Sequence, residues 1–409
     1  MTQSSHYPDL PHLEHFVVKD LIAQAEKFPV FWVSSSDELA NLCKQWRSAD
    51  LLAVDTEFIR EKTFYPIPAL VQVSDGTAIW LLDPLTIDNW QPFADILQNK
   101  NLAKIMHSLS EDIEVFLRLI GVAPDGVLDT QIGAGLAGFG GGLGYQRLVE
   151  ATLNLHVDKD QTRSDWLQRP LSVDQQRYAA ADVRYLPAIY QVLMEKLVTQ
   201  NRVHWWQHDS EGHAGASARP VEPEQYYRKI GLASRLRPRQ LAVLQAICAW
   251  REITVRELNI PRGHLFKDAV CAEIAKRLPH DMPALAAIGG IAPKSLRQYG
   301  EVILELVAVA AATETANCPP RVSVPGTQEK QQLQAMKEVV QAAAEKLGMP
   351  DDLLLRRRDY DAILQHRTCS VLSDWRRELL GDELIEALAR SASAIDSGAD
   401  LAVDSDKPN

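Results

Sequence analysis

The stretch Leu51-Leu52-Ala53-Val54-Asp55-Thr56-Glu57-Phe58 begins as an apolar strand and ends with two carboxylates. Residues two apart in a strand share a face, so Asp55 and Glu57 continue the row that Leu51 and Ala53 begin. A carboxylate in a core-facing row is costly unless a cation lies beside it, and a hard divalent ion such as Mg²⁺ is the usual occupant. A strand that becomes polar where it reaches solvent gives the same pattern. The pair alone therefore leaves both interpretations open.

A predicted helix near residue 110 carries a third carboxylate. Ser108 and Glu111 have the S-x-x-E spacing of a capping box, which predicts that the helix begins there. Asp112 lies at the edge of an apolar stripe with three- and four-residue spacing, formed by Ile113, Phe116, Leu117 and Ile120. The helix therefore brings a carboxylate next to a buried face.

A second predicted helix, residues 175–197, carries a fourth carboxylate inside its apolar stripe. Tyr178, Asp182 and Tyr185 recur at spacings of four and three, and Pro187 marks a kink or a restart. An ionised Asp182 in that stripe needs a cation, a hydrogen-bonded partner or a raised pKa. Tyr178 lies one turn earlier on the same face, so its hydroxyl is expected beside Asp182.

These four carboxylates need a common explanation. Without cations they would repel one another strongly, whereas two divalent ions about 3.5 to 4 Å apart would turn the repulsion into a binding site. Such a pair of ions suits in-line displacement at phosphorus. The sequence therefore predicts a site for two Mg²⁺ or Mn²⁺ ions, held by Asp55, Glu57, Asp112 and Asp182.

The composition is that of an ordinary globular protein. The chain has 409 residues, 46% of them hydrophobic and 24% charged. Five cysteines without CxxC spacing indicate neither a zinc site nor a disulfide framework, and no signal peptide or transmembrane run is evident. A cytoplasmic protein with no membrane partner is therefore expected. The net charge of -11 argues against a protein that coats nucleic acid, but not against an enzyme that meets phosphate through metal ions.

The pattern of elements predicts an α/β fold followed by two small all-α domains. Early strand-like runs have short connections, which favour antiparallel pairing, and later ones are separated by helices, which favour parallel pairing. A mixed sheet with flanking helices follows from this pattern. The predicted divisions are an N-terminal extension (1–29), the α/β domain (30–202), a linker (203–232), a helical domain (233–312), a linker (313–327), a second helical domain (328–394) and a disordered tail (395–409).

The acidic motifs resemble those of the DEDD superfamily of 3′-5′ exonucleases, in the subgroup with tyrosine in its third motif. Asp55-x-Glu57, Asp112 and Tyr178-x3-Asp182 match the three motifs. The flanking residues are similar to the bacterial ribonuclease D family over about residues 30 to 200. They are Val54–Phe58, His107–Asp112, Leu128–Thr130, Ser164–Trp166 and Arg169–Leu171.

The resemblance implies a ribonuclease H-like fold and a role for each motif residue. Asp55, Glu57 and Asp182 would ligate one metal ion, which activates water. Asp55 would bridge to a second ion at the leaving 3′ oxygen, and Asp112 would support that ion. Tyr178 would hold the attacking water in line with the phosphate.

The helical domains also resemble a known module. Residues 236–309 are similar to the helicase-and-RNase-D C-terminal (HRDC) domain, which implies accessory nucleic-acid binding. Residues 328–394 match less closely but lie where the family carries a second copy.

Two further sets of candidate site residues each have more than one interpretation. His107 and Asp129 are either catalytic or satisfy buried backbone groups, and His107 is also a candidate for substrate binding. Phe58, Phe64 and Tyr65 are candidates for stacking on terminal bases, with core packing as the alternative for Phe58.

Three functions are compatible with these residues. The leading hypothesis is a monomeric 3′-5′ exoribonuclease that trims RNA 3′ ends, such as those of tRNA precursors, and releases nucleoside 5′-monophosphates. A DNA 3′-5′ exonuclease would use the same carboxylates. A catalytically silent RNA-binding protein is the third alternative.

Overall fold

The computed structural model describes residues 17–157, 164–320 and 326–399, with side chains as far as residue 391. The chain divides into two compact units. The first comprises residues up to 58, 68–218 and from 325 onward, and the second comprises residues 59–67 and 219–324. Each unit is described separately below.

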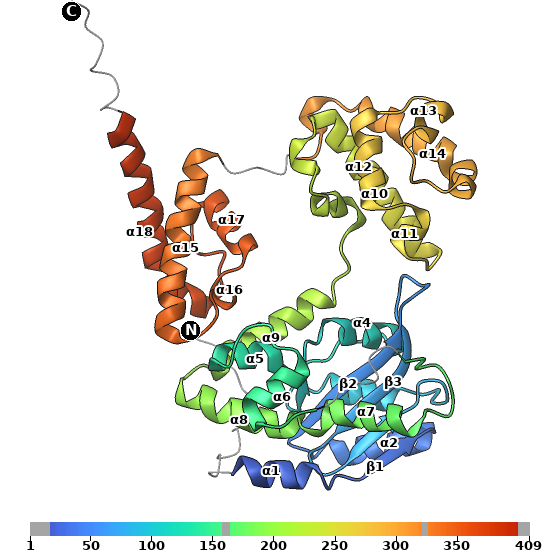
Figure 1. The fold of residues 1–409 in the computed structure, drawn as a ribbon, viewed down its shortest axis with the longest axis vertical. Coiled ribbons are helices and arrows are strands. Elements are labelled where there is room, and N and C mark those ends of the chain that lie inside the picture. The colour runs from blue at the N-terminus through green and yellow to red at the C-terminus, as the bar shows by residue number, and fades with distance from the viewer. Residues whose placement is uncertain (1–16, 158–163, 321–325, 400–409) are drawn as a thin grey trace, which may run out of the picture. The chain divides into compact units, whose positions relative to one another are not determined.

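A six-stranded mixed sheet forms the centre of the first unit (Figure 1). Its order is β1-β4-β3-β2-β5-β6. β1 with β4, β2 with β5, and β5 with β6 pair in parallel, and β3 with β4 is antiparallel, which confirms the predicted mixed sheet. The strands are β1 Val30–Val33, β2 Leu51–Ile59, β3 Ile67–Ser74, β4 Ile79–Leu82, β5 Ala103–Met106 and β6 Val127–Asp129. The sequence did not predict β6 as a strand, because three residues are too few to display a period.

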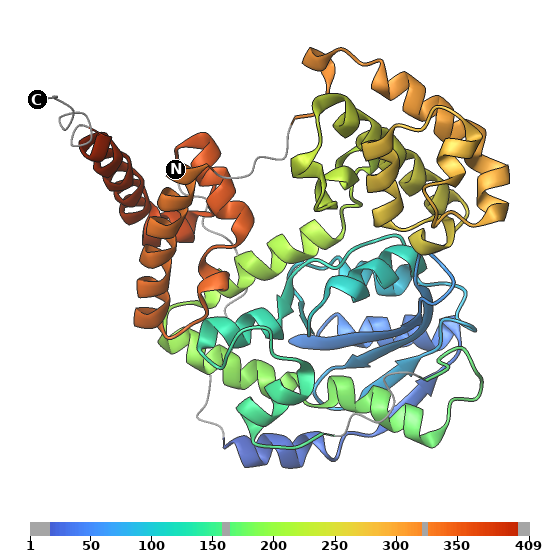
Figure 2. The ribbon, with the colours of Figure 1, turned by 45° about the horizontal axis from the view of Figure 1, so that its top comes forward.

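Helices cover both faces of this sheet, as the two views in Figures 1 and 2 show. Leu52 and Val54 of β2 pack into a core cluster with α2, α3 and α4. Alternation along the strand turns Ala53, which is fully buried, toward the face covered by α7 and α8. The helices are α1 Val18–Ala25, α2 Ser36–Trp46, α3 Gln91–Leu97, α4 Ser110–Leu119, α5 Thr130–Ala137, α6 Tyr145–Leu153, α7 Val173–Arg184, α8 Leu186–Thr199 and α9 Val203–Ser217.

The predicted capping box at the start of α4 is wrong. α4 begins at Ser110, and Leu109 at its N-cap makes no side-chain cap bond. Ser108 has a φ of 57°, and its backbone N–H donates to Asp129 at 3.1 Å. A carboxylate from the end of β6 therefore satisfies the backbone ahead of this helix, and local spacing cannot reveal such a tertiary contact.

The predicted linker at 203–232 is also wrong. Its first half is helix α9, which buries Trp206, Ser210 and Ala214 at four-residue intervals. Only one of these three residues is large and apolar, so the sequence hides the helical period. Its second half includes the 3₁₀ helix η1 Pro223–Lys229, whose Tyr226 and Tyr227 belong to the core of the second unit.

The second unit is a bundle of helices, as predicted. They are the 3₁₀ helices η2 Ala233–Arg235 and η3 Thr315–Asn317, and α10 Pro238–Glu257, α11 Arg262–Leu265, α12 Asp268–Arg277, α13 Met282–Ala286 and α14 Pro293–Ala311. Arg251 and Glu252 of α10 are completely buried. Arg251 pairs with Asp268 at 2.6 Å, and Glu252 pairs with Arg262 at 2.6 Å, so both buried charges are compensated.

The C-terminal helices belong to the first unit, and we call them the C-terminal module. They are α15 Thr327–Leu347, α16 Asp351–Leu354, α17 Arg357–His366 and α18 Asp374–Ala399. α18 continues into the predicted disordered tail, of which residues 400–409 lie outside the described residues. Among the described helices, none combines the length and the apolar character that crossing a membrane requires.

Candidate metal centre

Three predicted ligands meet at the end of β2. Carboxylate oxygens of Asp55, Glu57 and Asp182 lie within 4.8 Å of one another. β2 presents Asp55 and Glu57 on one face, and α7 brings Asp182 toward that face. The α7 backbone is fixed at its start by a capping box between Ser172 and Gln175.

Asp112 approaches from α4, on the other side of β2. The hydroxyl of Thr56, the residue between Asp55 and Glu57, donates to Asp112 Oδ1 at 2.6 Å. Asp112 is only 7% exposed. Strand alternation explains this arrangement, because it turns Thr56 away from its two acidic neighbours and toward α4. Asp112 is therefore a flanking carboxylate rather than a member of the three-residue cluster.

Burial and mutual repulsion disfavour ionisation of these four carboxyl groups. Burial is the largest cause of each shift, and it raises the pKa of Glu57 to about 9, of Asp182 to about 8 and of Asp112 to about 7. The pKa of Asp55 is raised well above its ordinary value by burial and then by the carboxylates of Asp112, Asp182 and Glu57. A divalent cation removes this cost by supplying the missing positive charge, and its preferred ligands are carboxylate oxygens. The residues present therefore fit a divalent metal.

Tyr178 lies beside the cluster, as its spacing predicts. Burial raises its pKa, and the carboxylates of Asp182 and Glu57 raise it further, so the hydroxyl remains protonated. The buried Trp166 fixes the ring, with a centroid distance of 6.1 Å. A neutral hydroxyl next to three metal-ligand candidates is suited to orienting a water molecule.

Tyr145 is a site residue that the sequence did not predict. Its hydroxyl donates at 2.7 Å to the carbonyl of Ala181, the residue before Asp182. Burial raises its pKa, and the nearby Asp182 contributes to the shift. Tyr145 thus supports the α7 backbone where Asp182 leaves it. The sequence gives no clear signal, because Tyr145 is the first residue of a different helix.

His107 and Asp129 have structural contacts behind the carboxylates. The Asp129 carboxylate accepts the backbone N–H groups of Ser108, Leu109 and Gln131. His107 Nδ1 lies 2.9 Å from the hydroxyl of Thr130, and burial lowers the His107 pKa. For Asp129 these contacts favour the backbone-supporting alternative, whereas the His107 contact is to a side-chain hydroxyl and favours neither alternative.

The three aromatic candidates for base stacking are divided between the two units. Phe58 is half-buried at the end of β2 in the first unit. Phe64 and Tyr65 belong to the second unit, with their rings edge to face at 4.9 Å. The Arg262 guanidinium lies 4.8 Å from the Phe64 ring, and Arg256 lies 5.7 Å from it. Phe64 therefore packs against arginines of its own unit.

Comparisons with known proteins show the family of this chain. Residues 30–198 match the 3′-5′ exonuclease family model, and residues 240–307 match the HRDC domain model. The chain is 40% identical to ribonuclease D of Pseudomonas paraeruginosa over 365 residues, covering 87% of this chain and 97% of the relative. It is 35% identical to ribonuclease D of Musicola paradisiaca over 372 residues, covering 87% and 98%. The crystal structure of Escherichia coli RNase D superimposes with a TM-score of 0.82 at 31% identity, covering 88% of this chain and 98% of that one. The chain belongs to the ribonuclease D family of 3′-5′ exonucleases.

Proposed function

We propose that this protein is a metal-dependent 3′-5′ exoribonuclease that trims the 3′ ends of RNA, such as tRNA precursors, and releases nucleoside 5′-monophosphates. The convergence of Asp55, Glu57 and Asp182 within 4.8 Å carries this proposal. The ribonuclease D relatives support RNA as the substrate class. The metal would be Mg²⁺ or Mn²⁺, with two ions in the site.

Each residue of the site has a role in this reaction. Asp55, Glu57 and Asp182 would hold one ion, and Asp55 with Asp112 would hold the second. When bound, the ions lower the pKa of water and neutralise charge on the scissile phosphate. The Tyr178 hydroxyl would orient the attacking water in line with the 3′ oxygen that leaves. The Thr56 hydroxyl donates to one oxygen of Asp112 and so would hold this carboxylate in place as a ligand of the ion or of its water.

Tyr178→Phe is expected to slow hydrolysis by about 10- to 100-fold, because loss of the hydroxyl misplaces the water while the carboxylates remain. Single-turnover rates at saturating Mg²⁺ measure the effect. The metal concentration for half-maximal activity should not change. A shift in that concentration with an unchanged maximal rate would contradict the orienting role.

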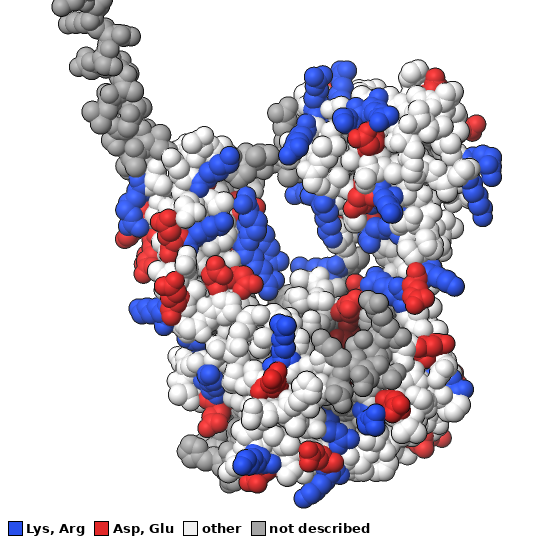
Figure 3. Space-filling view, in the orientation of Figure 1, with Lys and Arg blue, Asp and Glu red and all other residues white. Residues whose placement is uncertain are grey.

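Local charge supports RNA as the partner. Residues 219–324 carry 15 Lys or Arg and 10 Asp or Glu, although the whole chain has a net charge of -11. Figure 3 shows this excess of blue over red on the part formed by α10 to α14. A locally basic helical unit can bind phosphates without making the entire protein basic. We propose that the protein acts on RNA as a monomer in the cytoplasm.

Matched RNA and DNA oligonucleotides with the same sequence test the substrate class. We expect faster release of nucleotides from the RNA 3′ end, because discrimination depends on contacts to the 2′-hydroxyl. Preferential hydrolysis of DNA would favour the DNA exonuclease alternative. Binding of both oligonucleotides without hydrolysis in Mg²⁺ and in Mn²⁺ would favour the silent RNA-binding alternative.

A further inference from the structure

Buried residues of helix α9 form hydrogen bonds to the backbone at the end of β6. Trp206 and Ser210 of this helix are completely buried. The Trp206 indole N–H donates at 2.7 Å to the carbonyl of Asp129, and the Asp129 N–H donates at 3.0 Å to the Ser210 hydroxyl. A Cβ added to Gly133 of α5 would lie 2.7 Å from the indole, so only glycine leaves room for this side chain. Both backbone groups of Asp129 are thus bound to α9.

Asp129 in turn fixes the chain that leads into α4. Its two carboxylate oxygens accept the N–H groups of Ser108 and Leu109, at 3.1 and 3.2 Å. The first turn of α4 is also tied directly to α9, since the Ser110 hydroxyl lies 2.8 Å from His213 Nε2. Asp112 belongs to that same turn. Two series of contacts therefore connect α9 to the turn that carries this carboxylate.

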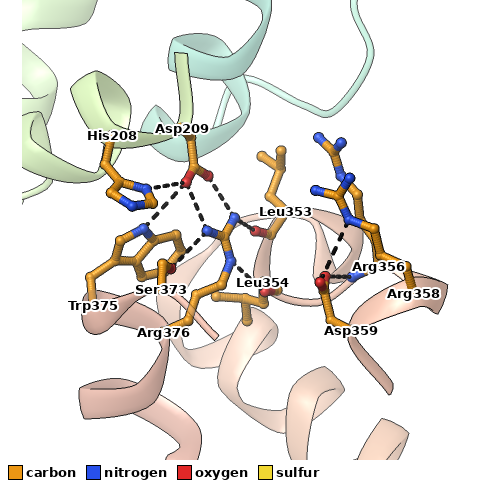
Figure 4. A network of polar contacts seen from close by, with 10 residues as sticks. All are labelled: His208, Asp209, Leu353, Leu354, Arg356, Arg358, Asp359, Ser373, Trp375 and Arg376. Atoms are coloured by element: carbon orange, nitrogen blue, oxygen red, sulfur yellow. Dashed lines mark hydrogen bonds and ion pairs between the residues drawn. The ribbon is translucent and has the colours of Figure 1, made fainter. Parts of the chain in front are cut away.

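The neighbouring face of α9 carries the C-terminal module. Arg376 of α18 makes two parallel hydrogen bonds to the Asp209 carboxylate, at 2.7 and 2.6 Å (Figure 4). Its remaining N–H groups donate to the carbonyls of Leu353 and Leu354 and to the hydroxyl of Ser373. All five guanidinium donors are used. Trp205 stacks on Trp375 with a centroid distance of 4.4 Å.

The ion pair between Arg376 and Asp209 is largely buried. Only 15% of the Arg376 side chain and 10% of the Asp209 side chain are exposed. Burial acts to raise the pKa of Asp209, but the hydrogen bonds from His208 and Arg376 outweigh it and lower the pKa. A charged, bidentate pair in such surroundings fixes geometry more firmly than a surface salt bridge does.

We propose that α9 couples the C-terminal module to the metal centre, and that the Arg376 to Asp209 ion pair is a positioning contact for Asp112. This inference rests on the proposed function, since it assigns Asp112 to the metal site. The proposal gives the C-terminal module a different role from the helices of the second unit. Residues 219–324 form a separate unit, whereas the C-terminal module is part of the unit that contains the carboxylates. Disturbing the module should therefore change metal binding itself.

The test compares neighbouring arginines of α18 in the full-length protein. Arg376→Ala is expected to weaken Mn²⁺ binding, measured by calorimetry without RNA, by roughly 3- to 10-fold. This is less than the roughly 10- to 100-fold effect of groups that contact a metal ligand directly, because Arg376 acts through α9. The Mg²⁺ concentration for half-maximal hydrolysis of a short single-stranded RNA should rise by the same factor. Arg377→Ala is the matched control, because Arg377 pairs with Asp374 of its own helix at 2.8 Å and is 47% exposed. It should change neither value.

Asp209→Asn provides a second variant that keeps the shape of the side chain and removes its charge. It should reproduce the effect of Arg376→Ala at a temperature where circular dichroism shows both variants folded. Metal affinities equal to that of Arg377→Ala in both variants would overturn the coupling while leaving the proposed function intact. Absence of Mn²⁺ binding and of hydrolysis in the unchanged protein would overturn both.

Discussion

Asp55→Asn is expected to reduce the rate of RNA hydrolysis by roughly 10³-fold or more, because Asp55 is the ligand proposed to be shared by both ions. The substitution keeps the size of the side chain and removes its charge. Loss of several kcal/mol of metal-dependent stabilisation of the transition state corresponds to a change of this size. Single-turnover hydrolysis of a 5′-labelled RNA in saturating Mg²⁺ measures it.

Binding of the same RNA in EDTA should be unchanged or slightly tighter in this variant, because one negative charge near the phosphates is gone. Asp50→Asn is a suitable control. Asp50 is exposed and immediately precedes β2, so its substitution should leave both hydrolysis and binding unchanged. Normal hydrolysis by Asp55→Asn would exclude Asp55 as a shared ligand.

The sequence predicted the three carboxylates of the cluster because their placement follows from local periods. A strand turns every second residue to one face, which joins Asp55 to Glu57. A helix returns after three or four residues, which places Tyr178 and Asp182 together inside a stripe. Asp182 was the most informative residue, since a carboxylate in a buried stripe needs the same explanation as the strand pair.

What the sequence did not predict depends on contacts between distant segments. The bond from Thr56 to Asp112 joins residues 56 apart, and the bond from Tyr145 to Ala181 joins residues 36 apart. The sequence predicts a linker in place of helix α9 because the buried face of this helix consists mainly of small side chains. Such a face becomes recognisable only when β6 and α5 pack on it.

Asp182→Asn is expected to raise the stability of the metal-free protein and to reduce the further stabilisation that metal binding provides. Without metal, folding places carboxyl groups where their pKa values are raised, from 3.8 to about 8 for Asp182 and from 4.5 to about 9 for Glu57. Between these limits the folded protein binds more protons than the unfolded chain. Its free energy of unfolding therefore falls as pH rises from about 4 to about 9. Removing the Asp182 carboxylate therefore reduces the fall in the free energy of unfolding at alkaline pH.

At pH 8.5 in EDTA the variant should therefore have a higher Tm than the unchanged protein, by roughly 1 to 2 °C for each kcal/mol of repulsion relieved. Saturating Mn²⁺ should raise the Tm of the unchanged protein more than that of the variant, because metal binds the ionised carboxylates. Asp174→Asn, at an exposed position in the first turn of the same helix, should keep the full Mn²⁺ response. A lower Tm for Asp182→Asn in EDTA at pH 8.5 would mean that Asp182 stabilises the metal-free fold, which contradicts the repulsive cluster. The expected outcome is that the cluster destabilises the empty fold and that a divalent cation reverses this effect.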